Sequence, residues 1–260
     1  RSSAASDVYK RQDLHKKGIN IQTVTVSFFQ FDSHMSRIWA FVQMGFARLY
    51  LSRVPGLTFY KLFGTGSDEG FTFKVNPLSN TGVYAILAVW PNANFAKEGV
   101  LNSKIFQKYK EWSKQNWTIF LKPISVRGSW SGKSPFSADE GNHEGQVVAL
   151  TRATIKIKTL LRFWEKVPDV QQMIGSDKNV LFKIGMGEVP WFHQVTFSIW
   201  PNQSAMDAFA RKNGAHSEAI KSVRKGEWFS EELYARFKIF DEIGDWDSKN
   251  PSIIGKDLEL

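Results

Sequence analysis

The sequence predicts an α+β fold in which one βαββαβ unit follows another. The main evidence is four short motifs that recur in the same order along the chain, which indicates a duplicated unit. Trp90-Pro91-Asn92 recurs as Trp200-Pro201-Asn202, Gly64-x-Gly66 as Gly185-x-Gly187, Val54-Pro55 as Val167-Pro168, and Gly128-x-Trp130 as Gly244-x-Trp246. We therefore expect two ferredoxin-like halves, residues 20–130 and 146–246, which pack sheet to sheet as a barrel of the dimeric α/β type within one chain.

The first half shows strand and helix signals in the order that such a unit needs. A strand is expected from residue 21, and Asp32-Ser33 is a helix cap. The helix predicted over 36–53 has an apolar stripe at helical spacing, and a second helical stretch contains Phe95 and Tyr109. Further strands are predicted at 57–63, 82–90 and 117–126. The stripe of the first helix consists of Ile38, Phe41, Val42, Phe46 and Leu49.

Three segments are expected to lie outside the two halves. Residues 1–19 do not share the pattern of the rest of the chain, and we expect a disordered leader that is not native to the fold. Residues 131–145 are polar and rich in Gly and Ser, which predicts a linker. Residues 247–260 are predicted to form an extended tail.

The second half contains a strand followed by a broken helix. The strand over 193–200 alternates, so that His193 shares a face with Val195 and Phe197, and we expect this face to look toward the helices. A helix capped at Ser204 should end at residues 213–214. A second helical piece then places His216 on an apolar stripe with Ile220 and Val223.

His216 has two interpretations. Position alone favours a core histidine that is satisfied by a backbone carbonyl. The alternative is an axial metal ligand, because a helix N-terminus disfavours imidazolium and keeps the ring neutral and able to coordinate. Arg224, two turns further along, is placed where it could pair with an anionic group.

Composition restricts the possible functions. The chain has 260 residues, a net charge of +9 and no cysteine, which excludes disulfides, iron–sulfur ligation and thiolate-ligated haem. A reducing, cytoplasmic location is the expectation, with membrane contact limited to the periphery because no apolar run approaches the ~18 residues of a spanning helix. Dispersed basic residues argue against nucleic-acid binding. Zinc-ligand spacing and a serine nucleophile elbow are both missing from the sequence.

Several stretches resemble the spheroidene monooxygenase family of acyclic-carotenoid ketolases. They are RIWAFVQMGFARLYL at 37–51, FYKLFGTGSDEGFTFKVNPLSNTGVYAILAVWP at 59–91, and the run from IGMGEVPWFHQ through GAHSEAIKSVR to LYARF at 184–237. The resemblance implies an oxygen-consuming, haem-dependent enzyme that hydroxylates a carotenoid end carbon and can repeat the step to give a ketone. Related haem proteins with paired ferredoxin-like units, among them aldoxime dehydratases, hold haem b beside a sheet through a histidine.

The resemblance assigns candidate site residues. It implies that His216 is the iron ligand, in a stretch that also contains Ile220 and Arg224 as cofactor-site residues. Phe197 and Met206 are further candidates for the cofactor site. His193 departs from the family pattern, and it is either a distal catalytic residue above the iron or a strand-end histidine near solvent. A monooxygenase would also need a ferredoxin-type electron donor, since no flavin or nucleotide motif is present. A haem-dependent dehydratase or lyase, and a non-enzymatic carrier of haem or an apolar ligand, remain as alternatives.

Overall fold

The structure, a computed structural model, describes residues 21–65, 82–139, 144–163, 179–189, 192–211 and 228–246. The first half contains strands β1 (Thr23–Gln30), β2 (Phe59–Gly64), β3 (Val83–Trp90) and β4 (Gln115–Gly128), with helices α2 (His34–Leu51), α3 (Ala93–Asn102) and α4 (Lys104–Trp112). The second half contains strands β5 (Val147–Ile155), β6 (Phe182–Val189), β7 (His193–Trp200) and β8 (Phe229–Gly244), with helix α6 (Gln203–Arg211) and the short helix η1 (Ile157–Thr159).

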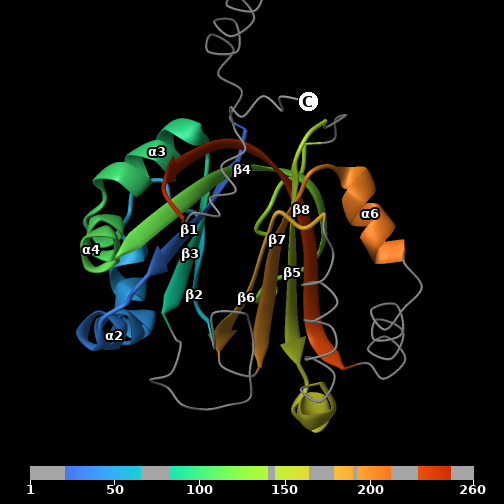
Figure 1. The fold of residues 1–260 in the computed structure, drawn as a ribbon, viewed down its shortest axis with the longest axis horizontal. Coiled ribbons are helices and arrows are strands. Elements are labelled where there is room, and N and C mark those ends of the chain that lie inside the picture. Colours follow the sequence, from blue (N-terminus) through green and yellow to red (C-terminus); the bar gives the residue numbers. More distant parts are fainter. Residues whose placement is uncertain are drawn as a thin grey trace, which may run out of the picture.

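The strands form one closed antiparallel barrel (Figure 1) in the order β1-β3-β2-β6-β7-β5-β8-β4. Each half therefore has the ferredoxin-like order, β4-β1-β3-β2 in the first and β8-β5-β7-β6 in the second. The halves join along β4 and β8, and again where Gly64 of β2 pairs with Gly187 of β6. The predicted fold class, tandem ferredoxin-like units that close into a dimeric α/β-barrel type in one chain, is confirmed.

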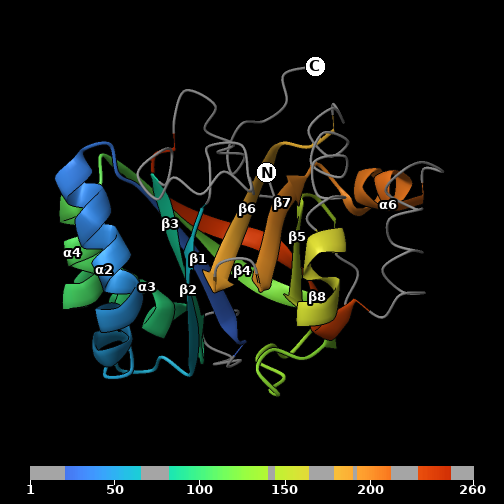
Figure 2. The same cartoon turned by 90° about the horizontal axis from the view of Figure 1, so that it is seen from below.

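The helices lie outside the barrel. Figure 2 shows α2, α3 and α4 on one side, against the first half, and α6 on the opposite side. Ser33 caps α2 as predicted, since its hydroxyl accepts a hydrogen bond from the Ser36 backbone N–H at 3.1 Å. The second helical stretch is two helices rather than one, because the backbone of Ser103 between them is extended. None of the helices in the described ranges is both long and apolar enough to cross a bilayer.

The repeated Trp-Pro-Asn motif turns each third strand into a helix. Trp90 and Trp200 are the last residues of β3 and β7, and both are buried. The Asn92 side chain accepts hydrogen bonds from the first turn of α3, and the Asn202 side chain accepts one from the Ala205 backbone N–H at 2.8 Å. The cap of α6 is therefore Asn202, and the prediction that Ser204 caps this helix is wrong.

The repeated Gly-x-Trp motif ends the two longest strands in the same way. Gly128 and Gly244 have φ values of +97° and +90°, in the left-handed region that favours glycine. A Cβ at Gly128 would lie 2.1 Å from the carbonyl oxygen of Glu232, and a Cβ at Gly244 would lie 2.3 Å from that of Asn116. The two halves thus meet through two equivalent close approaches of one backbone to another.

The repeated glycine pair aligns differently from the prediction. In β2, Gly64 pairs with Tyr84 of β3, and in β6, Gly187 pairs with Gln194 of β7. Because Trp90 and Trp200 end equivalent strands, this register makes Gly64 equivalent to Gly187 and not to Gly185. The two equivalent glycines are the pair that meets between the halves.

The barrel has an apolar interior to which all eight strands contribute, and a separate core lies under the helices of the first half. Val195 and Phe197 belong to the interior cluster, whereas Trp200 packs with Met206 of α6 on the outside. The expectation that the face of β7 with His193, Val195 and Phe197 looks toward the helices is therefore wrong. That face looks into the barrel.

Candidate functional site

The barrel interior is packed with aromatic side chains. Phe197 is fully buried there, with its ring centroid 5.4 Å from that of Phe28, and Phe182 packs on the same ring at 5.5 Å. Edge-on contacts of this kind are typical of a well-packed core. Phe197 therefore has the surroundings of a core residue, on the opposite side of β7 from α6.

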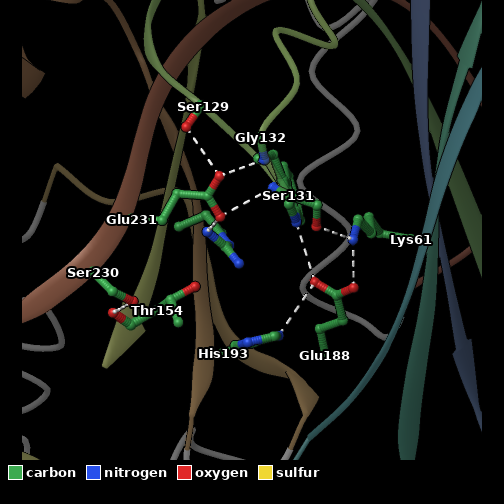
Figure 3. A network of polar contacts seen from close by, with 11 residues as sticks. Lys61, Ser129, Ser131, Gly132, Thr154, Glu188, His193, Ser230 and Glu231 are labelled. Carbon is green, nitrogen blue, oxygen red and sulfur yellow. Dashed lines mark hydrogen bonds and ion pairs between the residues drawn. The ribbon is translucent and has the colours of Figure 1, made fainter. Parts of the chain in front are cut away.

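A group of charged side chains occupies one mouth of the barrel (Figure 3). Lys61, Arg152, Glu188, His193 and Glu231 come from five strands, β2, β5, β6, β7 and β8. Each lies at an alternate position in register with residues of the interior cluster. We call these five residues the mouth network.

Glu188 is the centre of one half of the mouth network. It is 9% exposed, and its carboxylate lies 2.5 Å from the Lys61 ammonium and accepts a hydrogen bond from the Trp130 indole N–H at 3.1 Å. The Lys61 ammonium also donates to the Ser131 hydroxyl at 2.9 Å. Both oxygens of this buried carboxylate therefore have a donor, as burial of a charge requires.

Glu231 is the centre of the other half. Burial raises its pKa, but hydrogen bonds from the backbone N–H groups of Gly132 and Ser131, from the Ser129 hydroxyl and from Arg152 outweigh burial and lower the pKa to about 2. Arg152, which pairs with this carboxylate, is 1% exposed. Glu231 thus fixes the turn at 129–132 onto the end of the barrel, with Trp130 fully buried beneath it.

His193 lies at the edge of the mouth network. Its Nδ1 is 3.8 Å from the Glu188 carboxylate, and neither this atom nor the Nε of Arg152 has a hydrogen-bond partner among the described residues. Burial lowers the pKa of His193, and the opposing effect of Glu188 is smaller. The imidazole is therefore neutral near pH 7, on the interior side of the strand.

The sequence holds a signal for the mouth network that the repeated motifs do not reveal. Charged residues stand at inward positions of otherwise apolar alternating strands: Lys61 lies between Phe59 and Phe63, and Arg152 follows Val148 and Leu150 at the same spacing.

Part of the predicted linker also belongs to the barrel. Phe136 is 5% exposed and packs in the interior cluster, 5.1 Å from the ring of Phe237.

The outer face of the second half differs from that of the first. In the first half, the outer cross-strand pairs Leu62–Ile86 and Phe29–Tyr84 lie in the core under α2, α3 and α4. The strand registers place Gly185–Thr196 and Ala153–Gln194 at the equivalent positions of the second half. Three small side chains and the polar Gln194 thus replace bulky ones on a face next to α6. We call these four residues the small-residue face.

Gln194 is the polar member of the small-residue face. It is 6% exposed, and its side-chain oxygen has no hydrogen-bond partner among the described residues. A buried amide oxygen without a donor is costly, so a ligand that supplies a hydrogen-bond donor fits this position. Among the residues described, no three His, Cys, Asp or Glu side chains cluster as metal ligands.

The structure brings only part of the predicted site together. Met206 of α6 packs with Trp200 outside the barrel, on the same side of β7 as Gln194. Phe197 and His193 lie on the interior side. His216, Ile220 and Arg224 follow α6 in the chain and lie outside the described residues.

The chain is similar in sequence to three curated proteins, all named spheroidene monooxygenase. That of Cereibacter sphaeroides is 45% identical over 233 residues, which cover 89% of this chain and 71% of the relative. That of Rhodobacter capsulatus is 41% identical over 87% of this chain and 94% of the relative. That of Rubrivivax gelatinosus is 30% identical over 81% and 80%. A scan against models of protein families gives no match.

Solved structures with the same fold are much more distant in sequence. A crystal structure of aldoxime dehydratase superposes with a TM-score of 0.59, at 8% identity, over 87% of this chain and 85% of that chain. A second aldoxime dehydratase, in complex with butyraldoxime, gives a TM-score of 0.56 at 8% identity, over 86% and 81%. These likenesses support the barrel fold.

Proposed function

The chain belongs to the spheroidene monooxygenase family, and from this premise we propose that it is a haem-dependent monooxygenase of carotenoids. As a member it is an oxidoreductase. In the proposed reaction, a long apolar substrate of the carotenoid type is hydroxylated with dioxygen and can react again to give a ketone. The electrons come from a ferredoxin-type donor, and the protein works in the cytoplasm, at the surface of the membrane that holds the substrate.

The observation that carries this proposal is the small-residue face of the second half. A flat cofactor needs a sheet surface without bulky side chains, and Gly185, Thr196 and Ala153 provide one where the first half has Leu62, Ile86 and Phe29. The unpartnered oxygen of Gln194 lies on the same face. A haem b bound beside this face would supply the activation of dioxygen.

Residues of the chain are proposed to hold this group and to arrange the substrate. His216 is the proposed iron ligand, Ile220 and Met206 are proposed to contact the ring, and Arg224 is proposed to pair with a propionate. These assignments rest on the sequence and the family resemblance. Gln194 is a polar side chain on the same side of β7 as α6, and its oxygen has no hydrogen-bond partner among the described residues. It is a better candidate than His193 for the distal position, because His193 points into the barrel mouth.

The two alternative functions are compatible with the fold, but the sequence relatives do not support them. A dehydratase or lyase would agree with the structural likeness to aldoxime dehydratase, which at 8% identity bears on the fold alone. A carrier of haem or an apolar ligand would need the same outer face and no electron donor. Identities of 45% and 41% to spheroidene monooxygenases favour the oxidation reaction.

Absorption spectra of the purified, haem-supplemented protein test the proposal. We expect a Soret band with about one haem per chain, and a CO complex typical of histidine ligation. His216→Ala should lose the band, with imidazole restoring part of it, whereas His193→Ala should keep it. Haem-loaded protein should consume oxygen when reductant and a carotenoid are both present. A protein that takes up no haem under any of these conditions would contradict the proposal.

A further inference from the structure

The outer face of helix α2 carries a continuous row of exposed apolar side chains. Phe41 is 66% exposed, Leu49 is 60% exposed and Phe46 is 58% exposed. Because they recur at helical spacing, these residues form a stripe about 20 Å long on one side of the helix. The stripe consists of Met35, Ile38, Phe41, Val42, Phe46, Leu49 and Tyr50, and we call it the α2 face.

The helix packs on the barrel mainly with small side chains, together with Leu51, Trp39 and Met44, and leaves most of its larger apolar side chains in solvent. Its buried residues are Ser36, Ala40, Ala47 and Leu51. An amphipathic helix of a globular protein normally shows the opposite arrangement, with the bulky apolar side chains inward. A contiguous apolar patch of this size on a protein surface marks an interaction site.

Helix α4 extends the α2 face with aromatic and basic groups. Trp112 is 43% exposed, and its ring stacks on that of Trp39 of α2 at 5.3 Å with an interplanar angle of 4°. The Lys108 ammonium lies 6.0 Å from the centre of the Tyr50 ring. Tryptophan and basic side chains at the border of an apolar face are typical of proteins that bind at a membrane interface.

The charges around this face have one dominant sign. Helix α2 contains two arginines, Arg37 and Arg48, and no acidic residue. Helix α4 contains three lysines and a single acidic residue, Glu111. A second copy of the chain would bring like charges together at such a surface, whereas anionic lipid headgroups would neutralise them.

We propose that the α2 face, together with Trp112 and the basic side chains of α2 and α4, docks the protein onto an anionic lipid bilayer. The apolar stripe enters the boundary between headgroups and acyl chains, and Arg48 and Lys108 remain at the level of the headgroups. This inference rests on the proposed function in one respect: it identifies the surface through which the enzyme would contact the membrane. Its evidence is the exposure of these side chains, so it stands or fails separately from haem binding.

Vesicle sedimentation tests the apolar part of the surface. Wild-type protein should bind vesicles of mixed phosphatidylcholine and phosphatidylglycerol, and the combined variant Phe41→Gln, Phe46→Gln and Leu49→Gln should bind at least about tenfold more weakly. The matched control is Ile157→Gln with Leu161→Gln, which alters exposed apolar residues of the second half that are 78% and 71% exposed. The control should bind as the wild type does. Equal losses in both variants would overturn the proposal.

Charge variants test the headgroup contact. Arg48→Gln and Lys108→Gln should each weaken binding about fivefold at low salt and reduce the salt dependence, since a basic group near an anionic surface contributes a factor of about this size. Vesicles of phosphatidylcholine alone should bind more weakly than the mixed vesicles and show little difference between the variants. Equal binding to both vesicle types would contradict the charge argument.

A fluorescent probe locates the contact directly. Because the chain has no cysteine, a single environment-sensitive dye can be attached after Phe46→Cys or, as a control, after Leu161→Cys. Mixed vesicles should shift the emission of the dye at 46 to the blue and leave the dye at 161 unchanged. The reverse result would overturn the proposal. A second result would also overturn it. If the triple glutamine variant turned a dimer into a monomer and left vesicle binding unchanged, the α2 face would be a contact between two copies of the chain.

The outcomes separate this inference from the proposed function. The triple glutamine variant should keep the Soret band and its oxygen consumption with detergent-dispersed substrate. A protein that binds vesicles through α2 but takes up no haem would keep this inference and remove the haem proposal. A protein that binds haem, but whose vesicle binding is unaffected by substitutions in the α2 face, would keep the haem proposal and remove this inference.

Discussion

The two halves of the barrel have the same strands and the same turns, but they use their outer faces differently. In the first half, Ile86 of β3 is fully buried under helices. Its equivalent in β7 is Thr196, on a face lined by small side chains. The first half thus completes a second core with its own helices, whereas the second half carries smaller or polar side chains at the equivalent positions, where we propose that the flat cofactor binds.

The comparison separates the residues that build the barrel from those that are free to differ. The positions that match in both halves are the ones that turn the chain or let two backbones approach, namely the Trp-Pro-Asn caps and the Gly-x-Trp strand ends. The outer positions of the strands carry no such requirement. The two copies of the duplicated unit can therefore share one scaffold and still differ at their outer positions.

The two mouths of the barrel also carry different kinds of side chain at equivalent positions. The strand registers make Phe28 equivalent to Arg152, Val83 equivalent to His193, and Gln115 equivalent to Glu231. One mouth is closed by ion pairs around Trp130. At the other, Trp246 packs on Phe28 with ring centroids 5.8 Å apart. Apolar or uncharged side chains therefore occupy three positions of this second end whose equivalents belong to the mouth network, and the carboxylate found there, that of Glu242, accepts a hydrogen bond from the Trp117 indole N–H at 2.9 Å.

The largest predicted effect falls equally on both halves. Gly128→Val and Gly244→Val should each lower the free energy of unfolding by at least about 3 kcal/mol, because each combines a positive φ with a Cβ that would overlap a backbone carbonyl. Urea unfolding measures both. A variant that is tolerated at one position and not at the other would show that the halves do not share this scaffold.

The second prediction sets the two outer faces against each other. Ile86→Thr should lower the free energy of unfolding by about 2 to 3 kcal/mol, since it removes buried apolar volume and buries a hydroxyl. Thr196→Ala, at the equivalent position, should change it by less than about 1 kcal/mol. Thermal and urea unfolding of both variants test the difference, and equal costs would remove the distinction between a face filled by bulky apolar side chains and the small-residue face.

A third, smaller effect depends on pH and on the charged mouth. The native pKa of Glu231 is about 2, below the ordinary glutamate value of 4.5, so its contribution is present above pH 4.5 and is lost as the pH falls from 4.5 toward 2. Glu231→Gln should therefore cost about 1 to 2 kcal/mol near neutral pH and little at pH 2. The neighbouring exposed Glu232→Gln serves as control for the loss of a glutamate charge outside the mouth network. A constant cost for Glu231→Gln across this range would contradict the assignment.

The sequence predicted the features that depend on local chemistry. Repeated caps and glycines revealed the duplication, and alternation located β7 within its observed bounds, His193–Trp200. Alternation cannot say which side of a strand faces a barrel interior, because both sides of β7 are largely buried; hence the error over Val195 and Phe197. In the same way, the stripe of α2 predicted a helix but not that its apolar face is exposed. Alternation also marks Lys61 and Arg152 as charged residues at inward positions, but it cannot show that side chains from five strands meet in one mouth network, because that depends on how the strands are arranged in space.

The most direct test of the cofactor site fills the small-residue face. The double variant Gly185→Leu with Thr196→Ile places the side chains of the first half, Leu62 and Ile86, at the equivalent positions of the second. Haem titration of the apoprotein, followed at the Soret band, should show affinity at least about tenfold weaker than wild type. The far-ultraviolet circular dichroism should be unchanged, and the control Ile86→Val should bind haem normally. Unaltered haem affinity in the folded double variant would contradict the claim that the second half's outer face is the cofactor site.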